Sequence, residues 1–457
     1  GVASYTWNGT ESSFTVRLGH NTATTLSVNV LDGASRTEAV SEDPSFTFVN
    51  TGFRITTDGV TAASVGTHTA GKNSNVGFGA QTLFLQAVRT DTNTGSCTGV
   101  FSSQTVTVEM AAARINPSGG ASAVSVLNSA SSMTAIATSA GAPAGYTGVS
   151  LAFDAQSKAP LVFNYADAGS LTLHARYLLP SPPASVYMSG SSNTFVVRPF
   201  GLRVSGVTGG ATGPTGAAFA KAGANFNVTV TAVAWKTGDE ADAKGVPNNA
   251  AQISGNAATP NFGQEAAAAT ATISHVLNAP GGGNPGTLTG GAFSSFVAGT
   301  RTQAMSWSEV GIINLFALSS NYLGSGQNVT NPAAGLTGVG RFYPDHFFLA
   351  AGSAVTNRSG STCTPASTFT YIGEDIGLAF TLQARNTAGV VTQNYATASG
   401  FAKLNPATIA QLGLGAVNAT TNLTSRLQPG TRAGTFIAGQ AAVTATIKVD
   451  RASPDTP

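Results

Sequence analysis

Residues 219–237 read FAKAGANFNVTVTAVAWKT, and residues 369–387 read FTYIGEDIGLAFTLQARNT. The second stretch repeats the first, because Phe219, Gly223, Thr231, Ala234 and Thr237 align with Phe369, Gly373, Thr381, Ala384 and Thr387. Apolar residues alternate along both copies, a pattern that predicts β-strands. The repeated stretch therefore predicts two copies of one β-rich domain.

Two shorter phrases recur downstream of these strands. Thr259-Pro260-Asn261-Phe262 returns as Thr392-Gln393-Asn394-Tyr395, and Phe296-Val297-Ala298-Gly299 returns as Phe436-Ile437-Ala438-Gly439. The spacing between the phrases differs in the two copies. Surface loops tolerate such changes of length, so the pattern indicates a duplicated domain with loop insertions.

The composition favours an extracellular β-rich protein. Charged residues make up 9% of the chain, against roughly 25% in typical soluble proteins. Apolar residues make up 42%, with 24 Phe, a composition that argues against disorder. The net charge is +2 and there is no Lys/Arg run, so we expect neither nucleic acid nor an anionic membrane surface as partner. No apolar stretch reaches the ~18–20 residues of a membrane span.

The chain as a whole is predicted to be all-β, a string of tandem immunoglobulin-like β-sandwich domains. Short alternating runs such as 14–18, 83–88 and 171–175 are separated by Gly- and Pro-rich breakers. The expected domains are 1–114, 115–199, 200–343 with the first repeat copy, and 344–457 with the second copy and a C-terminal end that is cut short. The chain starts at Gly1 without Met or signal peptide, so we expect an exported, processed or excised piece of a larger protein.

Several phrases resemble the family of mannose-sensitive haemagglutinin pilus biogenesis protein Q. They are residues 340–347 (GRFYPDHF), 369–374 (FTYIGE), 384–386 (ARN), 392–395 (TQNY), 163–169 (FNYADAG) and 307–311 (WSEVG). The resemblance covers essentially the whole chain and corresponds to the C-terminal region of that family, which has no assigned function. It implies an exported bacterial protein linked to type IV pili, and it supplies no catalytic residues. Relatives place further cysteines after the position of Cys97, whereas residues 98–117 contain none.

No enzyme chemistry is predicted. The five histidines are scattered, no serine lies in a nucleophile-elbow setting, and no pair of carboxylates stands out. Asp239, Glu240 and Asp242 form the densest acidic group and are weak candidates for calcium, although a solvated loop explains them more simply. We expect no cofactor and no metal.

Five residues are candidates for contacts at domain edges. Arg198, Phe200, Arg341, Phe342 and Tyr343 could line a groove for a partner, although an interdomain hinge accounts for them better.

The two cysteines, Cys97 and Cys363, could form a disulfide in an exported chain if distant domains fold back on each other. Two separate thiols are the simpler alternative.

The predicted function is that of a non-enzymatic, extracellular bacterial surface protein associated with type IV pili, acting in adhesion or surface assembly. Its partner would be a pilus or other surface protein, or another copy of itself. One alternative is a self-assembling subunit of an extracellular filament. Another is a carbohydrate-binding module, in which Trp7, Trp235 and Trp307 would form the platform for a glycan.

Overall fold

The computed structural model describes residues 51–58, 63–90, 97–179, 186–248, 253–358, 369–408 and 411–450, together with residues 6, 9–10, 24–28, 31–32, 35–36 and 45–48. The described residues form many β-sheets, and the prediction of an all-β fold is confirmed. The helical elements with described bounds are two three-residue 3-10 helices, η2 (Tyr322–Gly324) and η3 (Thr424–Arg426).

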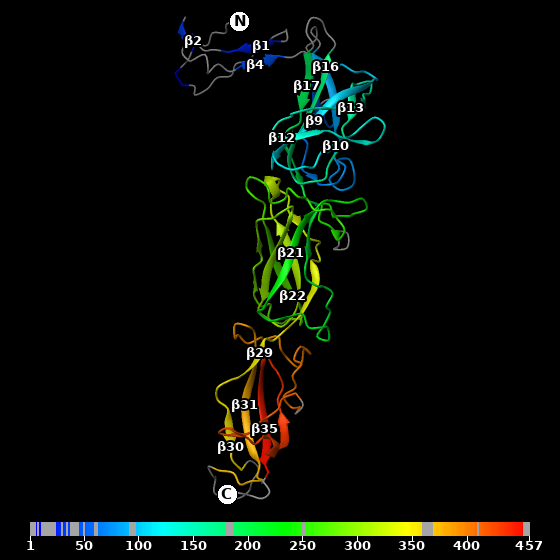
Figure 1. The fold of residues 1–457 in the computed structure, drawn as a ribbon. Helices are drawn as coiled ribbons and strands as arrows, with labels where there is room; N and C mark the ends of the chain where they lie inside the picture. Colours follow the sequence, from blue (N-terminus) through cyan, green and yellow to red (C-terminus); the bar gives the residue numbers. More distant parts are fainter. Residues whose placement is uncertain are drawn as a thin grey trace.

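Three packed units follow one another along one axis (Figure 1). We call residues 51–199 unit one, residues 200–343 unit two and residues 344–450 unit three. Among the residues described before position 51 are four short strands: β1 (Thr24–Ser27) pairs with β4 (Ser45–Phe48), and β2 (Leu31–Asp32) pairs with β3 (Ser35–Arg36).

The described residues of unit one form fourteen strands in three sheets. These are β5 (Thr51–Thr56), β6 (His68–Thr69), β7 (Phe84–Thr90), β8 (Cys97–Gly99), β9 (Thr105–Asn116), β10 (Val124–Leu127), β11 (Met133–Ala135), β12 (Ala137–Ala140), β13 (Thr147–Ala152), β14 (Lys158–Pro160), β15 (Phe163–Tyr165), β16 (Gly169–Leu179), β17 (Val186–Ser191) and β18 (Phe195–Arg198). The largest sheet has the order β12-β9-β16-β18-β6, with β13 also on β9 and β17 on β16. The others are β14-β7-β5, with β8 on β7, and β11-β10-β15.

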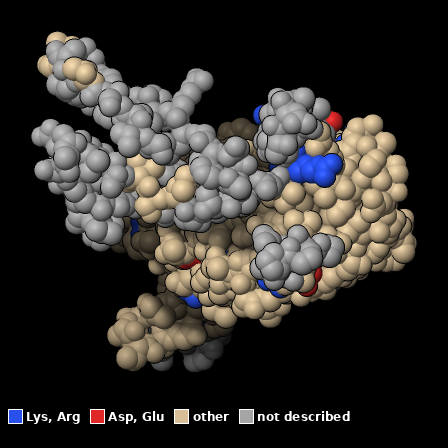
Figure 2. All heavy atoms as spheres, turned by 90° about the horizontal axis from the view of Figure 1, so that it is seen from above, with Lys and Arg blue, Asp and Glu red and all other residues tan. Residues whose placement is uncertain are grey.

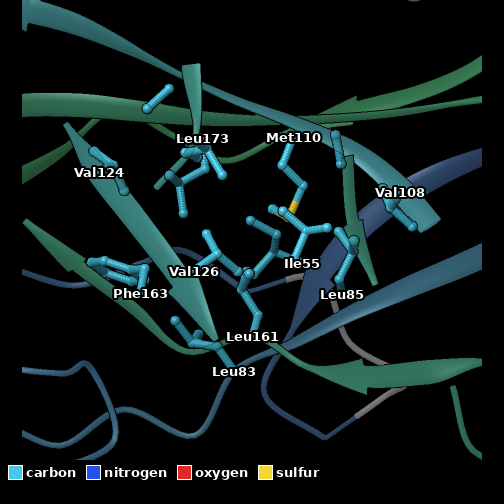
Figure 3. Close-up of a cluster of buried hydrophobic side chains, with 14 of the residues drawn as sticks. Ile55, Leu83, Leu85, Val108, Met110, Val124, Val126, Leu161, Phe163 and Leu173 are labelled. Atoms are coloured by element: carbon cyan, nitrogen blue, oxygen red, sulfur yellow. The ribbon is translucent and has the colours of Figure 1, made fainter. Parts of the chain in front are cut away.

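One hydrophobic core holds unit one together. It takes in Ile55, Leu85 and Met110 as well as Val126 and Leu173, whose side chains converge in Figure 3. The expected boundary between residues 114 and 115 falls inside β9, which pairs with β12, β13 and β16. Strands on the two sides of that position therefore form one packed unit, where the sequence suggested two separate sandwiches.

Unit two is a sandwich of two sheets. Its strands are β19 (Gly201–Ser205), β20 (Ala220–Lys221), β21 (Asn225–Val233), β22 (Ala271–Ala279), β23 (Leu288–Thr289), β24 (Ala292–Phe293), β25 (Thr300–Trp307), β26 (Gly311–Ser319), β27 (Val329–Thr330) and β28 (Leu336–Tyr343). One sheet has the order β19-β21-β25-β23, and the other has the order β20-β28-β26-β22-β24 with β27 on β26. Alternate side chains of both sheets meet in one core, as the period-two pattern of the strands requires.

The described strands of unit three form one five-stranded sheet of the same kind and a separate two-stranded sheet. Its strands are β29 (His346–Leu349), β30 (Ala354–Thr356), β31 (Ile376–Arg385), β32 (Val417–Asn418), β33 (Thr421–Asn422), β34 (Leu427–Ala433) and β35 (Gln440–Val449). The sheet order is β29-β31-β35-β34, with β30 also on β31, and β32 pairs with β33.

The repeat is present in three dimensions, with a different register in its first phrase. The Ala232 and Ala384 N–H groups donate to Gly299 and Gly439 respectively, so Ala232, rather than Ala234, is the counterpart of Ala384. The downstream phrases align as the sequence suggested, since the Thr259 N–H donates to the Ala232 carbonyl and the Thr392 N–H donates to the Ala384 carbonyl. A shift of two residues keeps every side chain on the same face of a strand, which is why alternation alone does not fix it.

The surface carries few charges. Lys, Arg, Asp and Glu are sparse on the described part of the face in Figure 2, as expected from a chain with 9% charged residues.

Candidate functional site

The contact between units one and two, which we call joint one, is organised by a buried carboxylate. Asp167 follows β15 and is 1% exposed. Its Oδ1 accepts hydrogen bonds from the Asn261 N–H of unit two at 2.9 Å and from the Ala168 N–H at 2.8 Å. Its Oδ2 accepts one from the Ser122 hydroxyl at 3.1 Å. Asn261 also donates through Nδ2 to the Tyr165 hydroxyl oxygen at 3.0 Å, so one turn of unit two is held by two side chains of unit one.

The same arrangement recurs between units two and three, at joint two. Glu309 follows β25 and is 4% exposed. Its Oε1 accepts a hydrogen bond from the Gln393 N–H of unit three at 2.7 Å. Its Oε2 accepts from the Asn394 N–H at 3.1 Å and from the Val310 N–H at 3.0 Å. Asn394 and Asn284 also exchange two side-chain-to-backbone hydrogen bonds across the joint, at 2.7 and 2.8 Å.

A backbone contact completes each joint. Trp235 N–H of unit two donates to Ala70 of unit one at 2.8 Å, and Thr387 N–H of unit three donates to Ala222 of unit two at 3.0 Å. The apolar cores also extend across the joints. Ala168 of unit one belongs to the core of unit two, and Val310 of unit two belongs to the core of unit three. Each unit is therefore held on the next by the same three contacts: a buried carboxylate, a backbone hydrogen bond and a shared apolar core.

A glycine makes the backbone contact possible in each joint. Gly71 has φ +80° and Gly223 has φ +83°, and both lie directly after the alanine that accepts the hydrogen bond. A Cβ on Gly71 would lie 2.5 Å from the Trp235 carbonyl oxygen. Glycine is required here both by the left-handed backbone and by the close approach of the next unit.

Gly71→Ala is expected to weaken joint one. The left-handed conformation costs an L-residue about 1–2 kcal/mol, and the clash with the Trp235 carbonyl adds to this cost. Differential scanning calorimetry of the whole chain measures the loss of stability. Gly77→Ala is the matched control, because Gly77 also has positive φ (+60°) but nothing lies within 4 Å of its Cβ position. Equal losses for the two variants would show that the Trp235 contact has no energetic role.

The two joint carboxylates, Asp167 and Glu309, have raised pKa values. Burial raises the pKa of Asp167 and the pKa of Glu309, although the N–H groups that donate to each carboxylate oppose the rise. The desolvation of the charged form outweighs these hydrogen bonds. Each joint therefore holds a carboxyl group that binds its proton more tightly in the folded chain than in the unfolded chain.

The free energy of unfolding is expected to fall as pH rises from the ordinary carboxyl pKa of about 4 through the raised values. The reason is that the folded chain binds more protons than the unfolded chain across this window. Urea unfolding from pH 4 to 8 of the chain and of its Asp167→Asn, Glu309→Gln double variant measures the effect. We expect a smaller decline in the double variant. An identical pH dependence in both would contradict the assignment of these protons to the joints.

Arg198 and Phe200 lie at joint one. Arg198 is buried and donates to Gln327 Oε1 at 2.8 Å and to the Gly245 carbonyl at 3.2 Å, both in unit two. Burial lowers the pKa of Arg198 to about 10. Phe200 is buried and stacks on Phe78 of unit one, with ring centroids 5.8 Å apart.

Arg341, Phe342 and Tyr343 lie at the other end of unit two. Arg341 donates to the Gly216 carbonyl at 3.0 Å, and Tyr343 pairs with a residue of β20 in parallel register. Phe342 is fully buried in the core of unit two against Trp307, with ring centroids 5.0 Å apart. The structure therefore does not bring this group together with Arg198 and Phe200.

The acidic group 239–242 organises its own loop. Asp239 accepts hydrogen bonds from Lys236 N–H at 2.8 Å and Asn256 Nδ2 at 2.6 Å. Asp242 accepts from the N–H groups of residues 244 and 246, both at 2.9 Å, and Glu240 contacts Asn248 Nδ2 at 3.4 Å. Within the described ranges, no group of three or more His, Cys, Asp or Glu residues is arranged to hold a metal ion.

The remaining sequence candidates are dispersed. Trp307 is fully buried, Trp235 is half-buried at joint one, and Trp7 lies outside the described residues. Trp307 therefore does not offer its ring to a glycan, as a platform built on these three tryptophans would require. Cys97 begins β8 and Cys363 lies outside the described residues, so their pairing stays a prediction. Among the helices described, none is long and apolar enough to cross a membrane.

Asp167 and Glu309 were not assigned a role from sequence. Both lie in phrases with the same form, an aromatic residue, any residue, an acid, an aliphatic residue and glycine: Tyr165 to Gly169 and Trp307 to Gly311. That shared form is the signal that could have identified them. Their partners, Asn261 and Asn394, lie in the repeated phrase that the sequence did reveal.

The fold and the joints define a class, an all-β protein of tandem domains joined end to end whose first domain is immunoglobulin-like. Three consecutive domains of one family match the chain. The first, described as "Domain of unknown function (DUF6701), first Ig-like domain", matches residues 30–191. The second domain of DUF6701 matches residues 198–306 and the third matches residues 309–457. The chain therefore has the three-domain architecture of DUF6701.

Two solved structures show weak likenesses to the chain. Invasin, titled a bacterial integrin-binding protein, is 11% identical with a TM-score of 0.28, and the match covers 88% of this chain and 55% of that one. The chain thus spans about half the length of the invasin structure. The D0-D1 domain of intimin is 11% identical with a TM-score of 0.16, and the match covers 58% of this chain and 91% of that one. No curated protein matches the chain.

Proposed function

We propose that the chain is a non-enzymatic stalk in a bacterial surface protein, which holds its domains in line for adhesion or surface assembly. The observation that supports this most directly is the repeated joint. Domains joined by a plain linker move relative to one another by default. Here a buried carboxylate, a backbone hydrogen bond and a shared apolar core fix each unit on the next. Such a joint transmits force and sets reach, which a surface stalk requires.

We further propose that the surface structure it serves is a type IV pilus system. The support is the sequence resemblance carried by residues 340–347 and by the phrases that end in Gly169 and Gly311. The last two phrases contain the joint carboxylates, so the resemblance coincides with the residues that connect the units. The sparsely charged surface suits packing against other polar proteins rather than against nucleic acid.

A deletion strain of the bacterium that encodes the chain tests the function. We expect deletion to abolish attachment to a surface while pili remain visible by electron microscopy. Re-expression of the native protein, or of its Glu240→Gln variant, is expected to restore attachment, because Glu240 is an exposed loop residue. The Asp167→Ala, Glu309→Ala double variant is expected to restore it only in part, at equal surface abundance.

Three outcomes would contradict the proposal. Unchanged attachment after deletion would remove the adhesive role, and loss of the pili themselves would place the protein in pilus assembly instead. Full restoration by the double variant would show that adhesion does not require joints held by these carboxylates. Electron microscopy of the purified chain adds a direct measurement, with single short rods expected for a stalk and long filaments expected for a polymerising subunit.

A further inference from the structure

Joint one contains a buried histidine in addition to its carboxylate. His68 lies in β6, two residues before Ala70, whose carbonyl accepts the Trp235 N–H of unit two. His68 is 2% exposed, and its ring packs edge-on against Phe163 with ring centroids 5.0 Å apart. The short segment from His68 to Ala70 is therefore fixed at one end by a buried ring and at the other end by the contact with unit two.

The hydrogen bond of this ring defines its tautomer. His68 Nε2 lies 2.6 Å from the Lys72 carbonyl oxygen, which can only accept, so Nε2 carries the proton of the neutral ring. Nδ1 is then a bare acceptor. It is buried and has no hydrogen-bond partner among the residues that the structure describes. A proton added to Nδ1 would therefore create a buried N–H group without an acceptor, which destabilises the closed joint.

The charged groups that act on the ring are both cations. Lys72 lies in the loop after β6, and Arg198 lies on β18, the strand that pairs with β6. They are 1% and 3% exposed, and the Lys72 ammonium donates to the Val76 and Phe78 carbonyls. Asp242 of unit two acts on Arg198 and not on the ring. A charged His68 would therefore be a third buried cation in one cluster.

The ring binds a proton more weakly in the closed joint than in water. Burial lowers the pKa of His68 from 6.5 to about 4, and Lys72 and Arg198 add to this fall, although the bond to the Lys72 carbonyl opposes it. Between these two values the closed joint binds fewer protons than the open joint. The contribution of His68 to stability is therefore complete above pH 6.5 and is lost as pH falls toward 4. This contribution is opposite in sign to that of Asp167 and partly offsets it.

The described residues of joint two lack this cluster. The parallel pairing of β20 with β28 matches that of β6 with β18, so positions in the two joints correspond. At joint two, Ala220 stands in place of His68, Ala224 in place of Lys72 and Tyr343 in place of Arg198. Lys221 and Asp345 form an ion pair there at 2.9 Å, with both side chains accessible to solvent. The buried histidine between two buried cations is therefore a feature of joint one and not of joint two.

We propose that joint one is an acid-sensitive joint, in which protonation of His68 drives its ring away from Lys72 and Arg198, separates Ala70 from Trp235 and shifts unit one toward release from unit two, while joint two stays closed. Histidine suits this role because its charge changes at mildly acidic pH. The inference does not depend on the proposed surface function. It gives the string of three units one position that opens in acid.

Amide hydrogen exchange of the whole chain at pH 7 and pH 5 tests the proposal. The Trp235 N–H reports on joint one, and the Thr387 N–H, which donates to the Ala222 carbonyl, reports on joint two. A histidine with a pKa of about 4 in the closed joint and 6.5 in the open joint makes opening about twentyfold more favourable at pH 5 than at pH 7. The protection of Trp235 relative to that of Thr387 measures this change.

His68→Gln is the matched control variant, because its amide can still donate to the Lys72 carbonyl but takes up no proton in this interval. Between pH 7 and pH 5, we expect the relative protection of Trp235 to fall at least tenfold more in the native chain than in the variant. Every other titrating group is the same in both chains, so the opposing effect of Asp167 cancels in the comparison. An equal pH dependence in the two chains would overturn the proposal.

A second measurement needs no variant and keeps the test decisive if His68→Gln does not fold. NMR of the histidine rings follows the titration of His68 in the native chain, and we expect this ring to be neutral at pH 5.5. A charged His68 ring at pH 5.5 with the Trp235 amide still protected would overturn the proposal. So would an equal loss of protection at Trp235 and Thr387 in acid, because opening would then be common to both joints.

Discussion

Glu309→Ala is expected to release unit three from unit two and to lower the stability of joint two by about 2–4 kcal/mol. The carboxylate accepts three backbone N–H groups, of Val310, Gln393 and Asn394, and the cost of burying its charge offsets much of what these hydrogen bonds contribute. Alanine would leave these N–H groups buried without an acceptor, which costs more than the bonds alone. Water entering the joint recovers part of this loss.

Small-angle scattering and hydrogen exchange measure the release. We expect a broader distribution of the distances between atoms within one molecule and faster exchange of the residue 393 and 394 amides. The β21 and β25 amides of unit two are expected to stay protected. Glu240→Ala is the control, because it removes an exposed glutamate of the same unit that makes no contact across the joint. An unchanged scattering profile together with unchanged exchange at residues 393 and 394 would show that the carboxylate does not hold the joint.

Trp307→Ala is expected to destabilise unit two by about 3–5 kcal/mol, the usual range for removing a buried tryptophan. The ring is fully buried against Phe342 and its Nε1 donates to the Pro285 carbonyl at 2.9 Å. Its own carbonyl accepts the Gly223 N–H at 2.6 Å, next to the backbone contact of joint two. The variant therefore leaves a cavity in the core and loosens the support of the joint.

Denaturant unfolding followed by hydrogen exchange resolves which unit is affected. We expect the amides of β22, β25 and β26 to exchange at lower denaturant, while those of β9 and β16 in unit one stay unchanged. Val297→Ala is the control, since Val297 is 74% exposed in the same unit and such surface changes stay within about 0.5 kcal/mol. Stability equal to the control would mean that Trp307 is not a core residue, which would reopen its use as a glycan platform.

The joints illustrate what a sequence can and cannot predict. The phrase that begins at Thr259 returns at Thr392, because each copy keeps the turn whose backbone N–H donates to a carboxylate of the preceding unit. The carboxylates were present in two similar phrases but had no predicted role. Asp167 bonds Asn261 across 94 positions and Glu309 bonds Gln393 across 84 positions, so no local pattern connects donor and acceptor.

The sequence by itself determined the all-β class, the repetition of one domain and the low surface charge, because side-chain alternation and composition act within a few residues. The tertiary structure decided the rest. It packs strands from both sides of residue 114 in one core and buries Trp307. It also shows that Ala232 is the counterpart of Ala384 in the repeat. The physical reason is that alternation reports which face a residue occupies. Only the packing of distant strands decides what covers that face, and which groups of one unit meet the next.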